Sequence, residues 1–235
     1  MPPTTVKSAY WSGFRDGTPF ILMALPFALL FGVVGTEAGL AFGQTFAFSL
    51  LVIAGAAQFA ALQLMIEDAA IVMVILAAVA VNLRMAMYSA SLVPYLGAAP
   101  MWQRVLIAYM NFDQTYVASI TKYEAVPDLT IAQRVAYFFG VASPIVPTWV
   151  GSTVIGIVAG SAIPPEYALD FIVPIMFLAM VGPLLKTKAH VAATVTSVVV
   201  ALALASLPSG MGLLIAAACA MVVGVVVETW EARNS

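Results

Sequence analysis

Long apolar runs separated by short polar links dominate the chain from about residue 18 to residue 230. Each run approaches the roughly 20 apolar residues that an α-helix needs to cross a bilayer. Backbone groups in lipid must be hydrogen-bonded within the segment, so runs this long predict helices rather than the alternating strands of a barrel. The pattern predicts an all-α polytopic integral membrane protein with seven to eight transmembrane helices. The expected spans are residues 18–36, 41–65, 69–92, 134–158, 167–185, 190–207 and 211–230, with 101–121 as the eighth.

Residues 101–121 are ambiguous because polar residues interrupt the apolar ones. The segment is either a polar-faced span or a helix lying in the interface. Lys and Arg favour the cytoplasmic side, so Lys7 and Arg15 place the N-terminus inside. A crossing through 101–121 would return the chain to the cytoplasm by Lys122. We therefore expect a span.

Composition supports a membrane protein. Hydrophobic residues make up 63% of the 235 residues and charged residues 9%, against about 25% charged in soluble domains. We expect a cytoplasmic or interfacial segment over residues 1–17, a single transporter domain over 18–230 and a cytoplasmic tail over 231–235. The net charge of −2, without a basic patch, gives no indication of nucleic-acid binding. The single Cys219 and single His190 exclude an intrachain disulfide and a metal site built from several His or Cys ligands.

Prolines interrupt several of the apolar runs. Pro19 and Pro26 lie on one face of the first span, and proline removes a backbone hydrogen bond to the preceding turn. Residues 143–147, Ser-Pro-Ile-Val-Pro, fall inside the span over 134–158, and Pro174 and Pro183 fall inside the next. We expect several proline-broken helices whose freed carbonyls face a substrate, an ion or a neighbouring helix. The alternative is an ordinary kink, which membrane helices tolerate.

A weak internal echo relates two of the runs. Residues 24–39 read ALPFALLFGVVGTEAG, and residues 145–160 read IVPTWVGSTVIGIVAG. Transporters are often built from two such halves, with broken helices near the binding site. The echo favours a possible two-halved internal repeat. Its halves run parallel if 101–121 spans the membrane and are inverted if it does not.

A few polar side chains lie within the apolar runs. A guanidinium at bilayer depth, such as that of Arg84, costs at least about 2.5–3.5 kcal/mol and is tolerated where it faces a partner, water or a substrate. The alternative is an Arg that snorkels to the headgroups. Tyr88 shares the helix face of Arg84. Asp113 is the counter-charge for Arg84 if its segment crosses, and an interfacial carboxylate if it does not. The candidate substrate-binding residues are Arg84, Asn82, Gln58, Tyr88, Asp113, Pro26 and Gln63.

The sequence lacks the motifs of common enzymes. It has no His or Cys metal spacing, no Gly-x-Ser-x-Gly and no phosphate loop, so we expect neither an enzyme nor a cofactor. The sparse polarity suits a small polar solute. Arg84 can take a carboxylate through paired hydrogen bonds. The Asn and Gln amides can orient the solute, and Asp113 can meet an ammonium or carry a proton.

These residues resemble the AzlC family, the large subunit of bacterial branched-chain amino acid exporters. The resemblance covers residues from about 13 to 116 well and the rest more loosely. The matching pieces are Gly13 and Gly17 ahead of Pro19, Ala24-Leu25-Pro26-Phe27 with Phe31-Gly32, Ala54-Gly55-Ala56-Ala57-Gln58-Phe59, Val81-Asn82-Leu83-Arg84 with Met87-Tyr88-Ser89 and Pro94, and finally Asp113.

The chain departs from the family at two places. The family usually shows Asp-Glu where this chain has Asp113-Gln114, and Pro-Phe-Gly where it has Pro26-Phe27-Ala28. The first departure removes a possible second carboxylate. It leaves the coupling mechanism and the exact substrate open.

The resemblance implies export of valine, leucine or isoleucine, with methionine as a further candidate, across the bacterial inner membrane. It also implies a partner, a small AzlD-like membrane subunit. For such a secondary exporter we expect coupling to the proton-motive force. Two other classes stay open. One is a channel or an exporter for another small polar metabolite, and the other is a non-transporting membrane assembly subunit.

Overall fold

The structure, a computed structural model, describes residues 5–162, 185, 187–205 and 211–234. Over these residues the chain forms helices and connecting turns without a strand, which confirms the expected all-α class. The chain divides into two compact units, Met1–Ala60 with Ala78–Ile163, and Ala61–Ala77 with Pro164–Ser235. Within the described ranges, four helices have the length and composition to cross a membrane: Val6–Glu37, Ile71–Leu96, Ile131–Gly160 and Met211–Glu231.

The first long helix consists of α1 (Val6–Gly17), a 3-10 turn (Thr18–Phe20) and α2 (Ile21–Glu37) without a break. The side chain of Thr5 accepts a hydrogen bond from the backbone N–H of Ser8 and caps the start. At about 1.5 Å per residue, this helix is longer than the roughly 30 Å hydrocarbon layer. The polar segment expected before the first span is therefore the beginning of the same helix.

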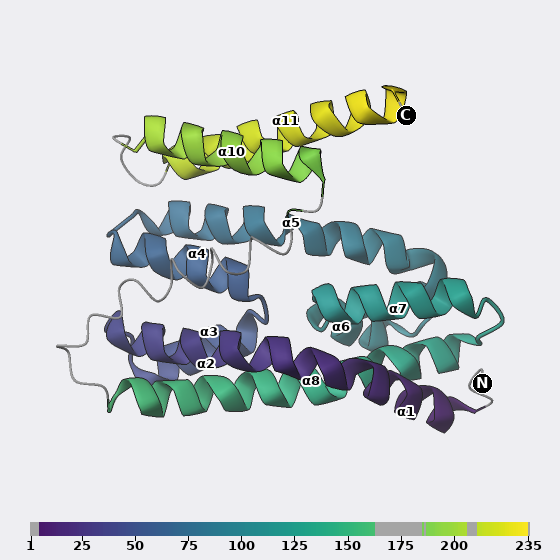
Figure 1. The fold of residues 1–235 in the computed structure, drawn as a ribbon. Coiled ribbons are helices and arrows are strands. Elements are labelled where there is room, and N and C mark those ends of the chain that lie inside the picture. Colours follow the sequence, from purple (N-terminus) through teal and green to yellow (C-terminus); the bar gives the residue numbers. More distant parts are fainter. Residues whose placement is uncertain (1–4, 163–184, 186, 206–210, 235) are drawn as a thin grey trace. The chain divides into compact units, whose positions relative to one another are not determined.

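Helix α8 (Ile131–Gly160) follows the first long helix in the same direction (Figure 1). Glycines allow the contact. A Cβ added at Gly13 would strike the backbone of Tyr137, and one added at Gly32 would lie 2.9 Å from the carbonyl carbon of Gly156. Small residues of this kind let membrane helices approach closely. The two segments that echo each other in sequence therefore pack against one another in parallel.

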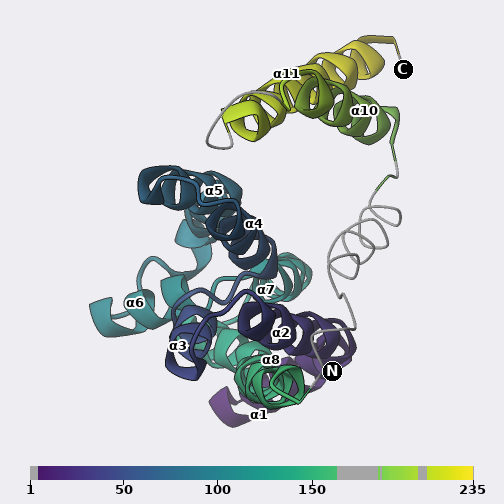
Figure 2. The same cartoon turned by 90° about the vertical axis from the view of Figure 1, so that its left-hand side faces the viewer.

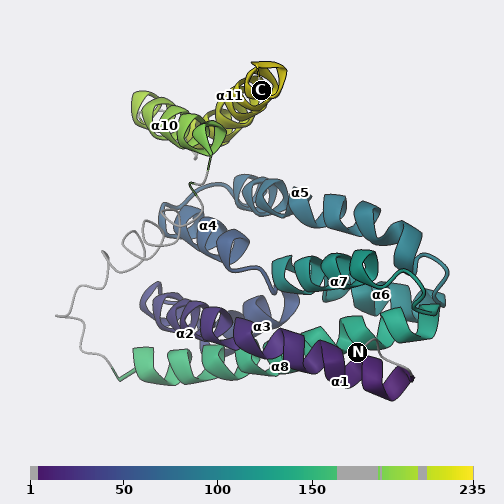
Figure 3. The same cartoon turned by 45° about the vertical axis from the view of Figure 1, so that its right-hand side comes forward.

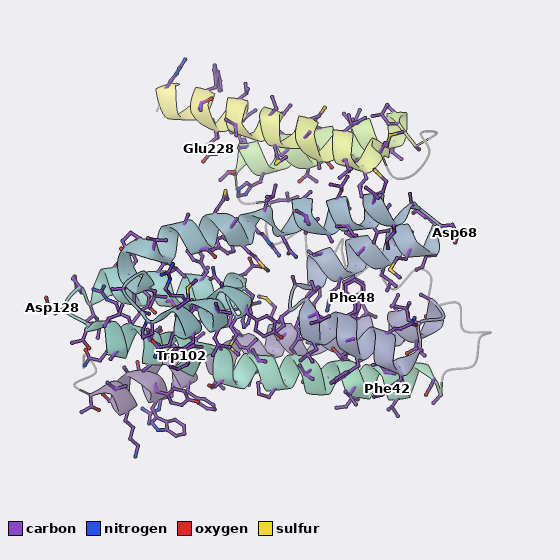
Figure 4. All side chains as sticks on the ribbon, turned by 180° about the vertical axis from the view of Figure 1, so that it is seen from behind. Phe42, Phe48, Asp68, Trp102, Asp128 and Glu228 are labelled. Carbon is purple, nitrogen blue, oxygen red and sulfur yellow. The ribbon has the colours of Figure 1, made fainter. Side chains whose placement is uncertain are left out.

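The span expected over 41–65 is instead two short helices, α3 (Phe42–Leu51) and α4 (Gly55–Ile66). Phe31 of α2 packs edge-to-face on Phe48 of α3 and on Phe59 of α4, with ring centroids 5.3 and 5.8 Å apart. Because both rings reach the same residue of α2, the chain doubles back at residues 52–54 and forms a hairpin (Figure 4). The prediction of one continuous span is wrong here, because a hydropathy pattern does not distinguish two stacked half-length helices from one long helix.

Helix α5 (Ile71–Leu96) matches the third expected span, but the segment after it forms a second hairpin (Figure 3). Helices α6 (Met101–Tyr109) and α7 (Asp113–Ala125) are joined at residues 110–112. Successive contacts between α5 and α7 involve increasing residue numbers in both helices. They are Tyr88–Asp113, Ser91–Tyr116 and Tyr95–Tyr123. Helix α7 thus runs in the same direction as α5, and the segment 101–121 forms parts of two short helices instead of the single helix expected.

Four of the described prolines lie inside helices without ending them. Helices α2, α5 and α8 continue through Pro26, Pro94, Pro144 and Pro147. In α8, the hydroxyls of Ser143 and Thr148 donate to the carbonyls of Phe139 and Pro144, one turn earlier. The breaks occur at residues 52–54 and 110–112, which contain no proline. A break is absent at Pro26, Pro144 and Pro147, where the sequence left an ordinary kink as the alternative. Pro174 and Pro183 lie outside the described residues.

The two hairpins enter this unit from opposite ends. The α3/α4 hairpin follows the end of α2 and lies beside the C-terminal half of α8, where Ser49 Oγ is 2.7 Å from Thr153 Oγ1. The α6/α7 hairpin follows the end of α5 and lies beside the N-terminal half of α8, where Tyr123 donates to the carbonyl of Arg134 at 2.8 Å. Figure 2 views this packing along the helices. A long helix followed by a hairpin therefore occurs twice, in inverted directions.

This topology explains the direction of the echo segments. They run parallel although 101–121 does not span, because the segment 41–65 does not span either. Two missing crossings cancel, so α8 has the same direction relative to α2 whether both hairpins are counted as crossings or neither is. The inverted pair is instead α1–α2 with α3/α4 and α5 with α6/α7.

Positive charge gathers at one end of the first unit, where α1 begins and α5 ends. Arg84 is the exception. The others are Lys7, Arg15, Arg104, Lys122 and Arg134. Lys122 Nζ donates to Ser12 Oγ at 3.2 Å, and the Arg134 guanidinium lies over the Tyr95 ring at 5.4 Å. Lys7, Arg15, Lys122 and Arg134 therefore lie toward the same end of this unit.

The second unit contains α10 (Lys188–Ala203) and α11 (Met211–Asn234). They pack as an antiparallel pair, with Lys188 Nζ 3.7 Å from Glu231 Oε1. An added Cβ at Gly224 would lie 3.5 Å from Ala193. These helices match the spans expected over 190–207 and 211–230. The span expected over 167–185 lies outside the described residues apart from Leu185.

Candidate functional site

The tips of the two hairpins meet at a small cavity of about 50 Å³. Arg84 and Met85 reach it from the centre of α5, and Trp149 reaches it from α8. The cavity therefore lies midway along the long helices, where transporters with inverted halves hold their substrates. Its lining residues are Ala24, Ile53, Ala54, Gly55, Arg84, Met85, Phe112, Asp113, Gln114, Ile145 and Trp149.

An ion pair occupies one wall of the cavity. Arg84 Nη2 is 3.1 Å from Asp113 Oδ2, and the two side chains are 36% and 40% exposed. The Tyr88 hydroxyl donates to Asp113 Oδ1 at 2.9 Å. The carboxylate therefore engages one nitrogen of Arg84 and turns its second oxygen to Tyr88. Arg84 Nε is buried and has no hydrogen-bond partner within the described residues.

A polar network holds the tip of the α6/α7 hairpin against α5. The Tyr88 ring stacks on Tyr116 with centroids 4.2 Å apart, and the Tyr116 hydroxyl is 3.1 Å from Ser91 Oγ. The amide of Asn111, which is 2% exposed, donates to Ser89 Oγ at 3.0 Å. The register of this hairpin on α5 is thus set by hydrogen bonds, and Asp113 is aligned with Arg84 as a result.

The tip of the α3/α4 hairpin is apolar and is closed by one amide. Gln58, which is fully buried, donates through Nε2 to the carbonyl of Val52 at 2.7 Å. The Trp149 ring lies beside Gly55, where an added Cβ would be 3.2 Å from the ring. The Tyr109 hydroxyl, at the end of α6, donates to the Leu50 carbonyl near the end of α3 and joins the two tips directly.

Two helices begin at the cavity and two end beside it. Helix α4 begins at Gly55 and α7 at Asp113, while α3 ends at Leu51 and α6 at Tyr109. Helix N-termini carry positive partial charge and C-termini carry negative partial charge. Half-helices that end in mid-membrane provide the binding groups for charged substrates in many transporters. Here that arrangement surrounds the Arg84–Asp113 pair.

The model of the AzlC protein family matches residues 19–163, a range that includes both hairpins and the Arg84–Asp113 pair. The chain belongs to the AzlC family. It is 28% identical over 198 residues to a protein of Archaeoglobus fulgidus named "Uncharacterized membrane protein", covering 81% of this chain and 84% of the relative. It is 25% identical over 189 residues to "Inner membrane protein YgaZ" of Escherichia coli, covering 75% and 73%. No solved structure matches the chain.

These findings confirm the family resemblance and make this AzlC-family chain a membrane protein of a transporter-related family. The names of the relatives do not state a solute or a partner. Both relatives are called membrane proteins, in agreement with the apolar helices.

The candidate residues predicted for this AzlC-family chain differ in where they lie. Arg84 and Asp113 line the cavity, Tyr88 contacts Asp113, and Gln58 closes the opposite tip. Asn82 does not line the cavity, and its Oδ1 is buried without a partner in the part of the chain that is described.

Pro26 and Gln63 are not brought to the cavity. Pro26 is exposed on α2, where its neighbours Ala24 and Phe27 face the tips instead. Gln63 is exposed further along α4 and donates to Glu67 at 2.8 Å. No signal in the apolar pattern showed which face of each helix turns inward.

Sequence reasoning missed Trp149, Gln114 and the tip residues around Phe112. Trp149 stands among apolar residues of α8, so only packing shows that it faces Gly55 and Arg84. Asn111 and Gln114 could have been found, because amides inside an otherwise apolar stretch need partners. Within the described residues, no cluster of three His, Cys, Asp or Glu side chains could hold a metal ion.

A second hollow lies between α5 and α6, away from the ion pair. It measures about 310 Å³, and apolar residues such as Leu92, Val93 and Leu96 form most of its wall. Arg104 and Asn111 line it too. Asn111 belongs to the α6/α7 tip, so the tip contributes to the wall of this hollow as well as to that of the central cavity.

Proposed function

We propose that this AzlC-family protein is a secondary active exporter of branched-chain amino acids in the bacterial inner membrane, working with a small AzlD-like membrane subunit. Valine, leucine and isoleucine are the expected solutes, with methionine as a further candidate. The observation that carries the proposal is the Arg84–Asp113 pair at 3.1 Å, placed midway along α5 where two opposed hairpin tips meet.

The chemistry of the pair suits a zwitterion. A guanidinium offers a fork of donors that matches a carboxylate, and Asp113 can receive an ammonium or a proton. Ile53, Met85, Phe112 and Ile145 supply an apolar wall suited to an aliphatic side chain. Charged groups inside a membrane commonly mark transport pathways, because they are costly to keep there without a function.

The size of the cavity supports a carrier that changes shape. At about 50 Å³ it is far below the roughly 300 Å³ at which pockets for small molecules begin. A whole amino acid therefore fits beside Arg84 only when a tip moves and enlarges the cavity. Because each tip enters from a different end, movement of one tip at a time would expose the pair to one side of the membrane and then to the other.

The charge distribution supports an orientation with the N-terminus in the cytoplasm. Lys7, Arg15, Arg104, Lys122 and Arg134 lie at the end where α1 begins. Cytoplasmic ends of membrane proteins carry an excess of Lys and Arg. In this orientation the α6/α7 hairpin enters from the cytoplasm, and the α3/α4 hairpin enters from the outer side.

Efflux of preloaded radiolabelled leucine from cells tests the proposal. The chain is expressed alone, with the small membrane subunit, and with that subunit as Arg84→Ala, Asp113→Asn or Arg15→Ala. We expect efflux to need the subunit and to fall to the empty-vector level in Arg84→Ala. Asp113→Asn should abolish the response to an imposed proton gradient. Arg15→Ala, which removes an exposed charge on α1, should transport normally.

Two results would overturn the proposal. Normal efflux by a correctly inserted Arg84→Ala protein would remove the pair from the pathway. Leucine efflux at the empty-vector level in every arm, with the proteins present in the membrane, would exclude branched-chain amino acids. Flux that does not saturate and ignores the proton gradient would identify a channel. Transport that survives apolar replacement of Arg84, Asn82 and Gln58 together would identify an assembly subunit whose partner carries the solute.

A further inference from the structure

Two hydrogen-bond donors at the central cavity have no acceptor. Arg84 Nε and Trp149 Nε1 are both buried and unpaired within the residues that the structure describes, and both side chains line the cavity. Trp149 is only 7% exposed. A buried donor left without a partner costs about 1–3 kcal/mol, so such groups at a binding site commonly wait for a ligand.

The neighbouring carboxylate does not satisfy these donors. Asp113 engages Arg84 through Nη2 and gives its other oxygen to Tyr88. The guanidinium fork is therefore only half used. The Trp149 ring packs beside Gly55 at the start of α4, and its indole N–H has no acceptor within the described residues.

The electrostatics at this point favour an anion. Helix α4 begins at Gly55 and α7 begins at Asp113, so two N-terminal ends with positive partial charge converge on the cavity. The guanidinium adds a full positive charge, and the indole N–H can donate but cannot accept. The space of about 50 Å³ compares with the roughly 30 Å³ that one water occupies, which admits a small polar group and not a whole amino acid.

We propose that Arg84 Nε and Trp149 Nε1 together form a carboxylate subsite between the hairpin tips, in which Trp149 discriminates solutes that carry a carboxylate from those that do not. The proposal rests on the proposed function only for the identity of the solute. The carboxylate binds the two free donors. Once a hairpin tip has moved and enlarged the cavity, the ammonium of a zwitterion lies toward Asp113 and the aliphatic group lies toward Met85 and Ile145.

Binding measurements on the purified full-length chain test the subsite. The probes are leucine, its amine-free analogue 4-methylpentanoate, its amide leucinamide, and 3-methylbutylamine, which lacks the carboxylate. Acetate and chloride serve as the smallest anions. The proteins are wild type, Trp149→Phe, which removes the N–H and keeps an aromatic ring, and Trp102→Phe, a matched control at a position that is 62% exposed. Calorimetry gives the affinity, and the ligand-induced rise in Tm gives a second readout.

We expect Trp149→Phe to weaken binding of leucine and 4-methylpentanoate about tenfold, equivalent to about 1.4 kcal/mol. Leucinamide and 3-methylbutylamine should bind the wild type and Trp149→Phe equally, and Trp102→Phe should match the wild type throughout. If Trp149→Phe is too unstable to purify, the wild type alone tests the subsite. It should bind 4-methylpentanoate more tightly than 3-methylbutylamine, and acetate more tightly than chloride.

The outcomes separate this inference from the proposed function. Equal weakening of carboxylates and amides in Trp149→Phe, or a wild type that does not prefer carboxylates, would overturn the subsite. Leucine efflux together with an unchanged affinity of Trp149→Phe for leucine would also overturn the subsite, while the proposed function as an exporter would stand. Trp149-dependent binding of acetate or 4-methylpentanoate without leucine transport would support the subsite and refute the choice of solute.

Discussion

The two hairpins share one backbone design and differ in chemistry. Each doubles back at a three-residue tip, and a side chain near the start of its second helix donates to tip carbonyls. Gln58 bonds to Val52 in α3/α4, and Thr115 bonds to Met110 and Phe112 in α6/α7. The similarity shows that a tip inside a membrane needs its carbonyls satisfied locally, because lipid supplies no donors.

The contacts beyond the tips separate the hairpins. The α3/α4 hairpin packs through aromatic rings on Phe31 of α2 and makes one hydrogen bond between neutral hydroxyls, Ser49–Thr153, to α8. The α6/α7 hairpin is joined to α5 by hydrogen bonds and by the Arg84–Asp113 pair. Aromatic packing does not change when a proton or a solute binds, whereas an ion pair and its hydrogen bonds can break when either one binds. We therefore expect α3/α4 to act as the more fixed support and α6/α7 as the half that responds to solute and protons.

The largest predicted effect comes from the glycine contacts under each hairpin. A Cβ at Gly156 would strike the backbone of Leu29 beside the α3/α4 half, and one at Gly140 would strike the backbone of Tyr10 beside the α6/α7 half. Gly156→Ala and Gly140→Ala should each destabilise by about 1–3 kcal/mol or more, because backbone cannot yield as side chains do. Hydrogen exchange should rise mainly in α3/α4 for the first variant and mainly in α6/α7 for the second.

Gly151→Ala provides the control, because an added Cβ there meets nothing within 4 Å. It should leave the Tm unchanged or slightly raised, since alanine favours helix over glycine. Identical exchange patterns for Gly156→Ala and Gly140→Ala would show that the halves do not behave independently and would remove the basis of the comparison.

A smaller effect is predicted at the α3/α4 tip. Gln58→Leu keeps the volume and removes the donor to the Val52 carbonyl, so the protein should lose about 1–2 kcal/mol of stability and the tip amides should exchange faster. Gln63→Leu, at an exposed glutamine of the same helix, should change stability by less than about 0.5 kcal/mol. Equal Tm values for the two variants would show that the carbonyl finds another donor and that the amide does not hold the tip.

The sequence predicted the class of fold and the most important pair, and failed on the hairpins. Arg84 and Asp113 were identified because charge in an apolar run demands a partner, and this demand can be read without a structure. The tips were missed because residues 52–54 read Val-Ile-Ala, which is as apolar as the helices beside them. What bends the chain there is one buried hydrogen bond from Gln58, and hydropathy does not record such bonds.

The prolines illustrate the opposite error. Pro144 and Pro147 indicated a break in α8, yet the helix continues through both. A proline removes one backbone hydrogen bond, and close packing of α8 against α1 and α2 offsets that loss. Trp149 was missed for a related reason. Its role depends on which face of α8 meets Gly55, and that is set by tertiary packing rather than by local pattern.

The smallest predicted effect concerns two tyrosine hydroxyls at the α6/α7 hairpin, one bonded to the charged Asp113 and one bonded to the neutral Ser91. Tyr88→Phe removes the donor to Asp113 and keeps the ring stacked on Tyr116, so it should cost about 0.5–1.5 kcal/mol, or a few-fold in leucine efflux. Tyr116→Phe removes only the bond to Ser91 and should leave efflux close to wild type, because Ser91 lies away from the ion pair. Efflux and its response to an imposed pH gradient, measured together, check both variants. If Tyr116→Phe reduced efflux as much as Tyr88→Phe, the loss would come from loosening the hairpin, and Tyr88 would have no direct influence on Asp113.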